Sequence, residues 1–98
     1  MSLALVFHPS VRIDMDDAYT WYETQNPGRG EDFLSSVQKV LDRIQNNPEM
    51  HARIYGDVRR CLTRRFPYGV FYRVEADRIC IVAVYHAKRD PAGWKSRV

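Results

Sequence analysis

The hydrophobic residues of this 98-residue chain change their period once along the sequence. Up to about residue 46 they recur every three or four positions, which is the spacing of one face of an α-helix. From residue 58 onward, short apolar runs follow one another with very short connections, which is the pattern of β-strands. Helices grouped ahead of a run of strands predict an α+β architecture in which the helices cover one face of a sheet.

A short strand and a helical hairpin are predicted in the first half. Leu3 to Phe7 is an apolar run that ends at His8-Pro9, and Ser10 is a suitable helix cap. The helix that follows carries one apolar stripe, with Trp21 beside it: Val11, Met15, Ala18 and Tyr22. After a turn at Asn26 to Gly30, a second helix carries the most regular stripe of the chain: Phe33, Leu34, Val37, Val40, Leu41 and Ile44.

Three strands are predicted in the second half, at residues 58–66, 69–75 and 79–86. Their connections are too short for a crossover helix, so they should form an antiparallel meander. Ile79 to Val84 is apolar on both faces, which suits a strand inside a helix-covered sheet. A short C-terminal cap docked by Trp94 should follow. The expectation is one domain over residues 1–98: an N-terminal strand, an antiparallel helical hairpin on one face of an antiparallel sheet, and the other face free for function.

Several classes of protein are excluded by what the sequence lacks. No apolar run is long enough for a membrane span, so a cytoplasmic protein is expected. There is no P-loop, HExxH, GxSxG or dinucleotide-binding glycine motif, and therefore no cofactor is expected. His8, His51 and His86 are isolated from one another and from Cys61 and Cys80, so no metal site is predicted. Both cysteines are expected to be buried free thiols.

Positive charge collects in the second half of the chain. The net charge is +3 and the isoelectric point is near 9.1, which favours an acidic partner. Alternation along residues 58–66 places Arg59 and Arg65 on one side of a strand and Arg60 and Arg64 on the other, and leaves open which side faces solvent. The cations predicted to bind a target are Arg59, Arg65, Arg73, Lys88 and Arg89.

The end of the last strand carries most of the candidates for catalysis. Tyr85 and His86, with Lys88 and Arg89 nearby, have the groups needed to activate a ribose hydroxyl and stabilise a phosphate. The plainer alternative is that a strand-end histidine bonds a neighbouring backbone group. The candidates for a nuclease site are Arg65, Tyr85, His86 and Arg89.

Motifs spread along the chain resemble those of the ParE/RelE toxin superfamily. The most specific is RFPYG at residues 65–69, followed by a strand and then VYHAKRDP at residues 84–91. The resemblance covers Leu3 to Arg97 and implies a helical hairpin on an antiparallel sheet. It also implies a toxin of a type II toxin–antitoxin module, of the kind called plasmid stabilisation proteins, in a hetero-oligomer with a cognate antitoxin.

The resemblance also bears on the target. RelE-like toxins cut messenger RNA in the ribosome, whereas ParE-like toxins poison DNA gyrase. RelE-type nucleases have an arginine after the tyrosine that opens the third strand, but here Gly69 follows Tyr68. Trp94-Lys95 stands where an aromatic hydroxyl is expected, and Tyr85-His86 reverses the order of YoeB-like nucleases. The resemblance therefore implies a gyrase inhibitor that acts by binding; a ribosome-dependent mRNA endoribonuclease and a non-toxic binding module are the alternatives.

Overall fold

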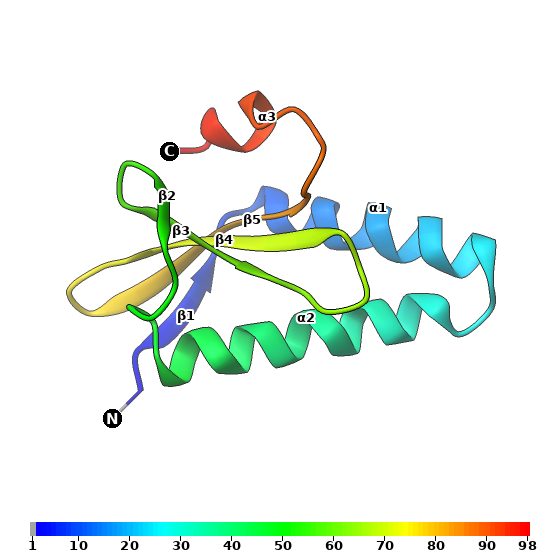
Figure 1. Ribbon diagram of the computed structural model, residues 1–98, viewed down its shortest axis with the longest axis horizontal. Helices are drawn as coiled ribbons and strands as arrows, with labels where there is room; N and C mark the ends of the chain where they lie inside the picture. Colours follow the sequence, from blue (N-terminus) through cyan, green and yellow to red (C-terminus); the bar gives the residue numbers. More distant parts are fainter. Residues whose placement is uncertain (1) are drawn as a thin grey trace.

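Five strands form one sheet, and two long helices cover one of its faces (Figure 1). The computed structural model describes residues 2–98. In chain order the elements are β1 (Ala4–Phe7), α1 (Ser10–Gln25), α2 (Arg29–Asn46), β2 (Arg53–Tyr55), β3 (Val58–Leu62), β4 (Tyr68–Val74), β5 (Arg78–His86) and α3 (Ala92–Lys95). The predicted α+β class is confirmed, and no helix within residues 2–98 is long and apolar enough to cross a membrane.

The sheet is mixed, with the strand order β1-β5-β4-β3-β2. The predicted meander is confirmed in β3, β4 and β5, which pair antiparallel. The expectation of a wholly antiparallel sheet is wrong at one edge, because β1 pairs parallel to β5. A parallel neighbour needs a long connection, which the chain between the two strands supplies. The three exposed residues of β2 were not predicted, since they show no alternation of burial.

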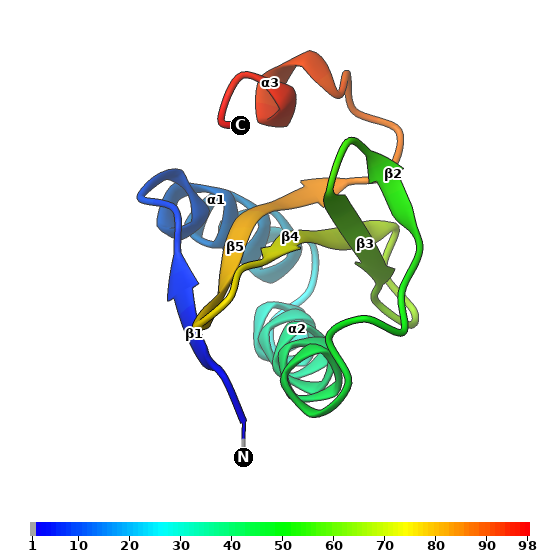
Figure 2. The same ribbon diagram turned by 90° about the vertical axis from the view of Figure 1, so that its left-hand side faces the viewer.

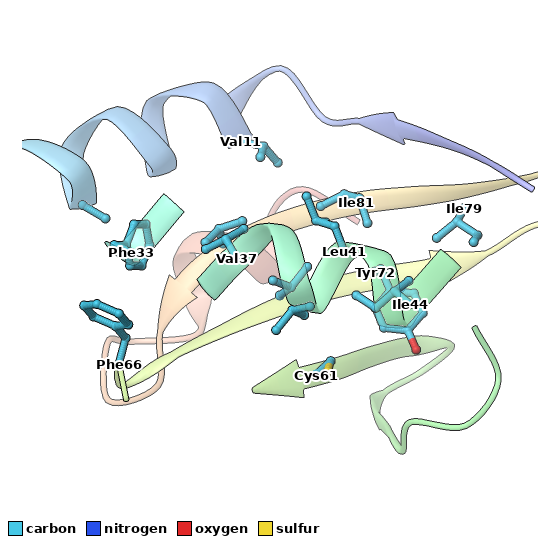
Figure 3. Close-up of a cluster of buried hydrophobic side chains, with 14 residues drawn as sticks. Val11, Phe33, Val37, Leu41, Ile44, Cys61, Phe66, Tyr72, Ile79 and Ile81 are labelled. Atoms are coloured by element: carbon cyan, nitrogen blue, oxygen red, sulfur yellow. The ribbon is translucent and has the colours of Figure 1, made fainter. Parts of the chain in front are cut away.

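The main core lies between the helical hairpin and the sheet (Figure 3). The stripe of α2 is buried as predicted: Phe33, Val37, Val40, Leu41 and Ile44. It packs against inward-facing residues of the sheet: Cys61, Val70, Tyr72, Ile79 and Ile81. The stripe of α1 is buried at Val11 and Ala18, whereas Trp21 beside it is 60% exposed. The second helix is therefore the principal cover of the sheet.

Side chains that the pattern did not single out hold the ends of α1. Ser10 is not the cap that was predicted, because the helix already begins at Ser10 and Pro9 occupies the cap position. The Ser10 N–H donates to Nδ1 of His8 over 3.1 Å. At the other end, the Glu23 carboxylate accepts hydrogen bonds from the N–H groups of Gly28 and Gly30, each at 3.0 Å. Gly28 has a φ of 92°, a conformation that favours glycine. These contacts set the tight reversal between the helices.

The strand β3 is shorter than the predicted 58–66 run. It ends at Leu62, since the Thr63 hydroxyl donates to the carbonyl oxygen of Phe66 over 2.9 Å and starts a turn there. Arg65 within this turn has a positive φ of 68°. The assignment of Arg64 and Arg65 to opposite faces of a strand is therefore wrong, because both lie in the β3–β4 connection.

The face of the sheet away from α2 is partly covered by α3 (Figure 2). Its buried residues form a second cluster: Val58, Phe71, Val82, Ala83, Tyr85 and Trp94. Trp94 is 4% exposed and stacks on Phe71 with ring centroids 4.6 Å apart, which confirms its predicted docking role. The expectation that this whole face is free is wrong, because an irregularity in the β4–β5 register turns Val82 and Ala83 both toward it and makes it apolar enough to need a cover.

Candidate functional site

A groove opens beside α3 on the second face of the sheet, and we call it the α3-side groove. Its volume is about 320 Å³. The lining combines apolar and cationic side chains: Ile54, Arg60, Phe71, His86, Ala87, Arg89, Pro91, Trp94 and Lys95. The α3-side groove therefore has the composition of a surface that binds acidic and apolar groups together.

Aromatic rings position two of the cations at this groove. The guanidinium carbon of Arg89 lies 4.5 Å from the centre of the Tyr85 ring, and Nζ of Lys95 lies 4.5 Å from that of Tyr55. Cations are attracted to the faces of such rings, and these contacts leave their hydrogen-bond donors free. The stem of Arg60 crosses Gly69, since a Cβ there would lie 3.1 Å from its Cγ. A side chain at position 69 would occupy the space that Arg60 uses.

Tyr85 and His86 do not converge on one point. Tyr85 is 5% exposed beneath α3, where its hydroxyl packs against Gly93. The His86 ring lies 5.3 Å from the ring of Tyr68, and its Nδ1 accepts the N–H of Lys88 over 3.0 Å. The plainer alternative for a strand-end histidine, a bond to neighbouring backbone, is confirmed.

A second groove lies between α2 and the β3–β4 connection, and we call it the α2-side groove. Its volume is about 520 Å³, and every residue that lines it has a polar or charged side chain: Asp32, Ser35, Ser36, Lys39, Arg43, Arg64 and Arg65. The Ser36 hydroxyl donates to the carbonyl oxygen of Arg64 over 3.0 Å and fixes the turn against the helix. The lining residues that come from α2 recur at helical spacing and form a polar stripe beside the apolar one: Asp32, Ser35, Ser36, Lys39 and Arg43. This stripe was the sequence signal that could have revealed the groove.

The other predicted target-binding cations lie outside both grooves. Arg59 donates from Nη1 to two backbone carbonyl oxygens of the segment before β2, at 3.0 and 2.7 Å. Arg73 pairs with Asp57 across 3.3 Å, and Lys88 is exposed in the turn after β5. Arg59 and Arg73 thus hold loops in place. The structure separates the predicted basic surface into Arg65 at one groove and Arg89 at the other.

Two titratable side chains of the sheet that pack in the main core, Cys61 and Tyr72, favour their neutral forms. Burial raises the pKa of the Cys61 thiol, which disfavours a reactive thiolate, although Arg43 beside it acts in the opposite direction. Burial also raises the pKa of Tyr72 to about 12, and its hydroxyl donates to the carbonyl oxygen of Pro48 over 2.6 Å. Cys61 is buried as predicted, whereas Cys80 is only half-buried; both are free thiols. This cluster has the character of a core and not of a nucleophilic centre.

Known proteins share both the sequence and the fold of this chain. A family model described as "ParE toxin of type II toxin-antitoxin system, parDE" matches residues 5–91. Two curated relatives, each named Toxin ParE2, come from Mycobacterium tuberculosis strains CDC 1551 / Oshkosh and H37Rv. Each is 29% identical over 99 residues, covering 100% of this chain and 94% of the relative.

A solved structure has the same arrangement of helices and strands. It is titled "Chromosomal ParDE TA system from P. aeruginosa" and superposes with a TM-score of 0.76. The match covers 86% of this chain and 95% of the other at 18% identity, so it bears on the fold alone. The family match extends from β1 to the residue before α3 and includes both long helices and all five strands. The chain therefore belongs to the ParE toxin family of type II toxin–antitoxin systems.

Proposed function

We propose that this toxin inhibits DNA gyrase by binding to it, and that the α3-side groove is the surface that contacts the target. The observation that carries the proposal is the combination of Arg60, Arg89 and Lys95 with an apolar lining that includes Phe71 and Trp94. Aromatic and arginine side chains dominate binding energy at protein interfaces. The cations suit acidic groups on the partner and increase the rate of association.

The placement of the candidate catalytic groups favours binding over cleavage. General acid–base catalysis requires two proton-transferring groups within reach of one substrate. The Tyr85 hydroxyl packs against Gly93, and the Nδ1 lone pair of His86 accepts a backbone hydrogen bond. The cognate antitoxin would neutralise the toxin by laying an extended or helical segment across the groove, which is a common mode of peptide recognition.

Growth and enzyme assays test this proposal. Expression of the toxin alone should arrest bacterial growth, and the cognate antitoxin should restore it. Purified toxin should inhibit gyrase supercoiling, and Arg89→Glu should weaken that inhibition at least tenfold. Arg12→Glu is the matched control, because the Arg12 side chain is 90% exposed on α1 and lines neither groove. Full supercoiling activity in the presence of saturating folded toxin would rule out gyrase as the target.

One feature favours the ribosome-dependent endoribonuclease as the second candidate. The position that carries an arginine in RelE-like toxins is Gly69 here, yet the Arg60 side chain crosses it from the neighbouring strand. Arg60, Arg89 and His86 therefore line one groove. Mapping messenger RNA ends after toxin induction separates the two functions. Intact transcripts support gyrase binding, whereas new ribosome-dependent cuts that disappear in His86→Ala support cleavage.

A further inference from the structure

We infer that the α2-side groove binds the phosphate backbone of a nucleic acid. The groove lies on the helix-covered side of the sheet, whereas the proposed gyrase surface lies beside α3 on the other side. It brings four cations together with two serine hydroxyls and one carboxylate: Lys39, Arg43, Arg64, Arg65, Ser35, Ser36 and Asp32. The site is therefore separate from the one that the proposed function uses.

The residues that line the groove fit one of two kinds of acidic partner better, a nucleic acid or an acidic peptide. A polypeptide interface normally has buried apolar or aromatic anchors at its centre, and no apolar residue lines this groove. Phosphate oxygens of nucleic acids are contacted mainly by arginine, lysine and small hydroxyl side chains. All of these are present, so a sugar–phosphate backbone fits this groove better than an acidic peptide.

The cations of the groove are available to an external ligand. Arg65 is 3.9 Å from Asp32, and both side chains are more than half exposed at 64% and 54%, so water screens this pair. The only hydrogen bond of the Arg43 guanidinium within residues 2–98 goes to the sulfur of Cys61, at 4.0 Å, and a thiol is a weak acceptor. Neither Lys39 nor Arg64 forms an ion pair with a carboxylate in residues 2–98. The groove therefore carries an excess of uncompensated positive charge.

The backbone at Arg65 is a second, independent observation. Its φ of 68° lies in the left-handed region, which side-chain-bearing residues rarely adopt and which glycine enters without strain. This conformation lets the following residue, Phe66, enter the core at 4% exposure while Arg65 stays at the mouth of the groove. Strained residues cluster at functional sites. An arginine at a position where glycine would fold more easily points to a role for the guanidinium itself.

Binding to DNA alone tests the inference without gyrase. The probe is a fluorescein-labelled duplex of 30 base pairs, titrated with purified toxin from 50 to 300 mM NaCl and followed by anisotropy. The logarithm of the association constant should fall with the logarithm of salt, with a slope of roughly −2 to −4, since each phosphate contact contributes about −0.9. Arg64→Ala and Arg65→Gly should each weaken binding and reduce that slope by about one.

Two controls make the result specific. Arg12→Ala removes the same charge from an exposed site on α1 and should leave the affinity and the salt slope unchanged. Arg65→Gly relieves the strained backbone, so its melting temperature should equal or exceed that of the wild type, and its loss of binding cannot then be attributed to unfolding. An equal loss of affinity in Arg12→Ala would show that binding follows net charge alone and would overturn the inference.

A final arm identifies the class of ligand. The second probe is a single-stranded RNA with the same charge as the duplex. Weaker binding of this RNA by Arg64→Ala and Arg65→Gly supports a phosphate site. The ratio of its affinity to that of the duplex shows which nucleic acid is preferred. Binding of poly-glutamate through these residues, with no binding of either nucleic acid, would assign the groove to an acidic polypeptide and contradict the inference. Gyrase inhibition by Arg65→Gly is measured separately, so failure of either proposal can be recognised on its own.

Discussion

Arg97 and Asp14 form a two-point ion pair between residues 83 positions apart in the sequence. The two guanidinium nitrogens lie 2.7 and 2.9 Å from the carboxylate oxygens, and the two side chains are only 12% and 6% exposed. Asp14 also accepts the N–H of Val84 over 3.1 Å, and Arg97 donates to the carbonyl oxygen of Val82 over 3.1 Å. This pair joins α1 to the C-terminal tail across β5. Because the tail directly follows α3, the pair also holds that helix near the sheet.

Loss of Arg97 should destabilise the protein strongly. Arg97→Ala leaves the Asp14 carboxylate buried without its cation, so we expect the free energy of unfolding to fall by roughly 3 kcal/mol. Urea denaturation followed by circular dichroism measures this change. Arg12→Ala removes an exposed ion pair with Asp16 and should change stability by less than about 0.5 kcal/mol. Equal stability of the Arg97→Ala and Arg12→Ala variants would mean that the C-terminal tail is not docked through this pair.

The close approach of Gly93 to Tyr85 should make position 93 intolerant of any side chain. A Cβ there would overlap the Tyr85 hydroxyl and lie 2.9 Å from the carbon that bears it. We expect Gly93→Ala to cost roughly 1 to 3 kcal/mol, because the overlap must push α3 away from β5. Fluorescence of Trp94 in a Trp21→Phe background reports the movement, and Tyr85→Phe should restore part of the docking because it removes the nearest atom. Unchanged Trp94 emission in Gly93→Ala would contradict this contact.

The stripe of α2 should contribute a large share of stability. Leu41 is 9% exposed in the main core, so Leu41→Ala should lower the free energy of unfolding by roughly 2 to 5 kcal/mol. Gln38→Ala, on the exposed side of the same helix, is the control and should cost well under 1 kcal/mol. A change below about 0.5 kcal/mol for Leu41→Ala would mean that the stripe is not part of the core in solution.

Stability should decrease on mild acidification because of His51. Burial lowers the pKa of this imidazole, and the nearby charges of Arg43 and Arg59 lower it further. Its Nε2 is buried without a hydrogen-bond partner among the described residues. Since the folded-state pKa lies below the ordinary value of about 6.5, the stability that His51 contributes is present above that pH and is lost as the pH falls through the folded-state value.

Chemical denaturation between pH 7 and pH 5 measures this effect. The loss of stability on acidification should be smaller in His51→Gln than in the wild type, because glutamine does not titrate. Gln38→Ala, which changes no titratable group, is the control and should retain the wild-type dependence. Identical pH profiles for His51→Gln and the wild type would show that this imidazole stays accessible to solvent.

Local pattern alone determined the helices and the meander of this protein. The apolar stripe from Phe33 to Ile44 keeps helical spacing throughout and can be buried only against the sheet, so the sequence was sufficient to identify α2 and the face it buries. Short apolar runs and short connections likewise identified β3, β4 and β5. The three exposed residues of β2 have no such pattern and depend on pairing with β3. The end of β3 at Leu62 depends on hydrogen bonds of Thr63 that periodicity does not encode.

The tertiary structure alone decided which cations share a surface. Arg59 and Arg60 are neighbours in sequence, yet one bonds a loop and the other lines the α3-side groove, because successive side chains of a strand point to opposite faces. Lys39 and Arg65 come together only because the β3–β4 connection folds against α2. Asp14 finds Arg97 across almost the whole chain. Such contacts depend on the packing of distant segments. Residue type and spacing predicted a basic α+β protein and the resemblance indicated a toxin, while the fold determined where the two grooves lie.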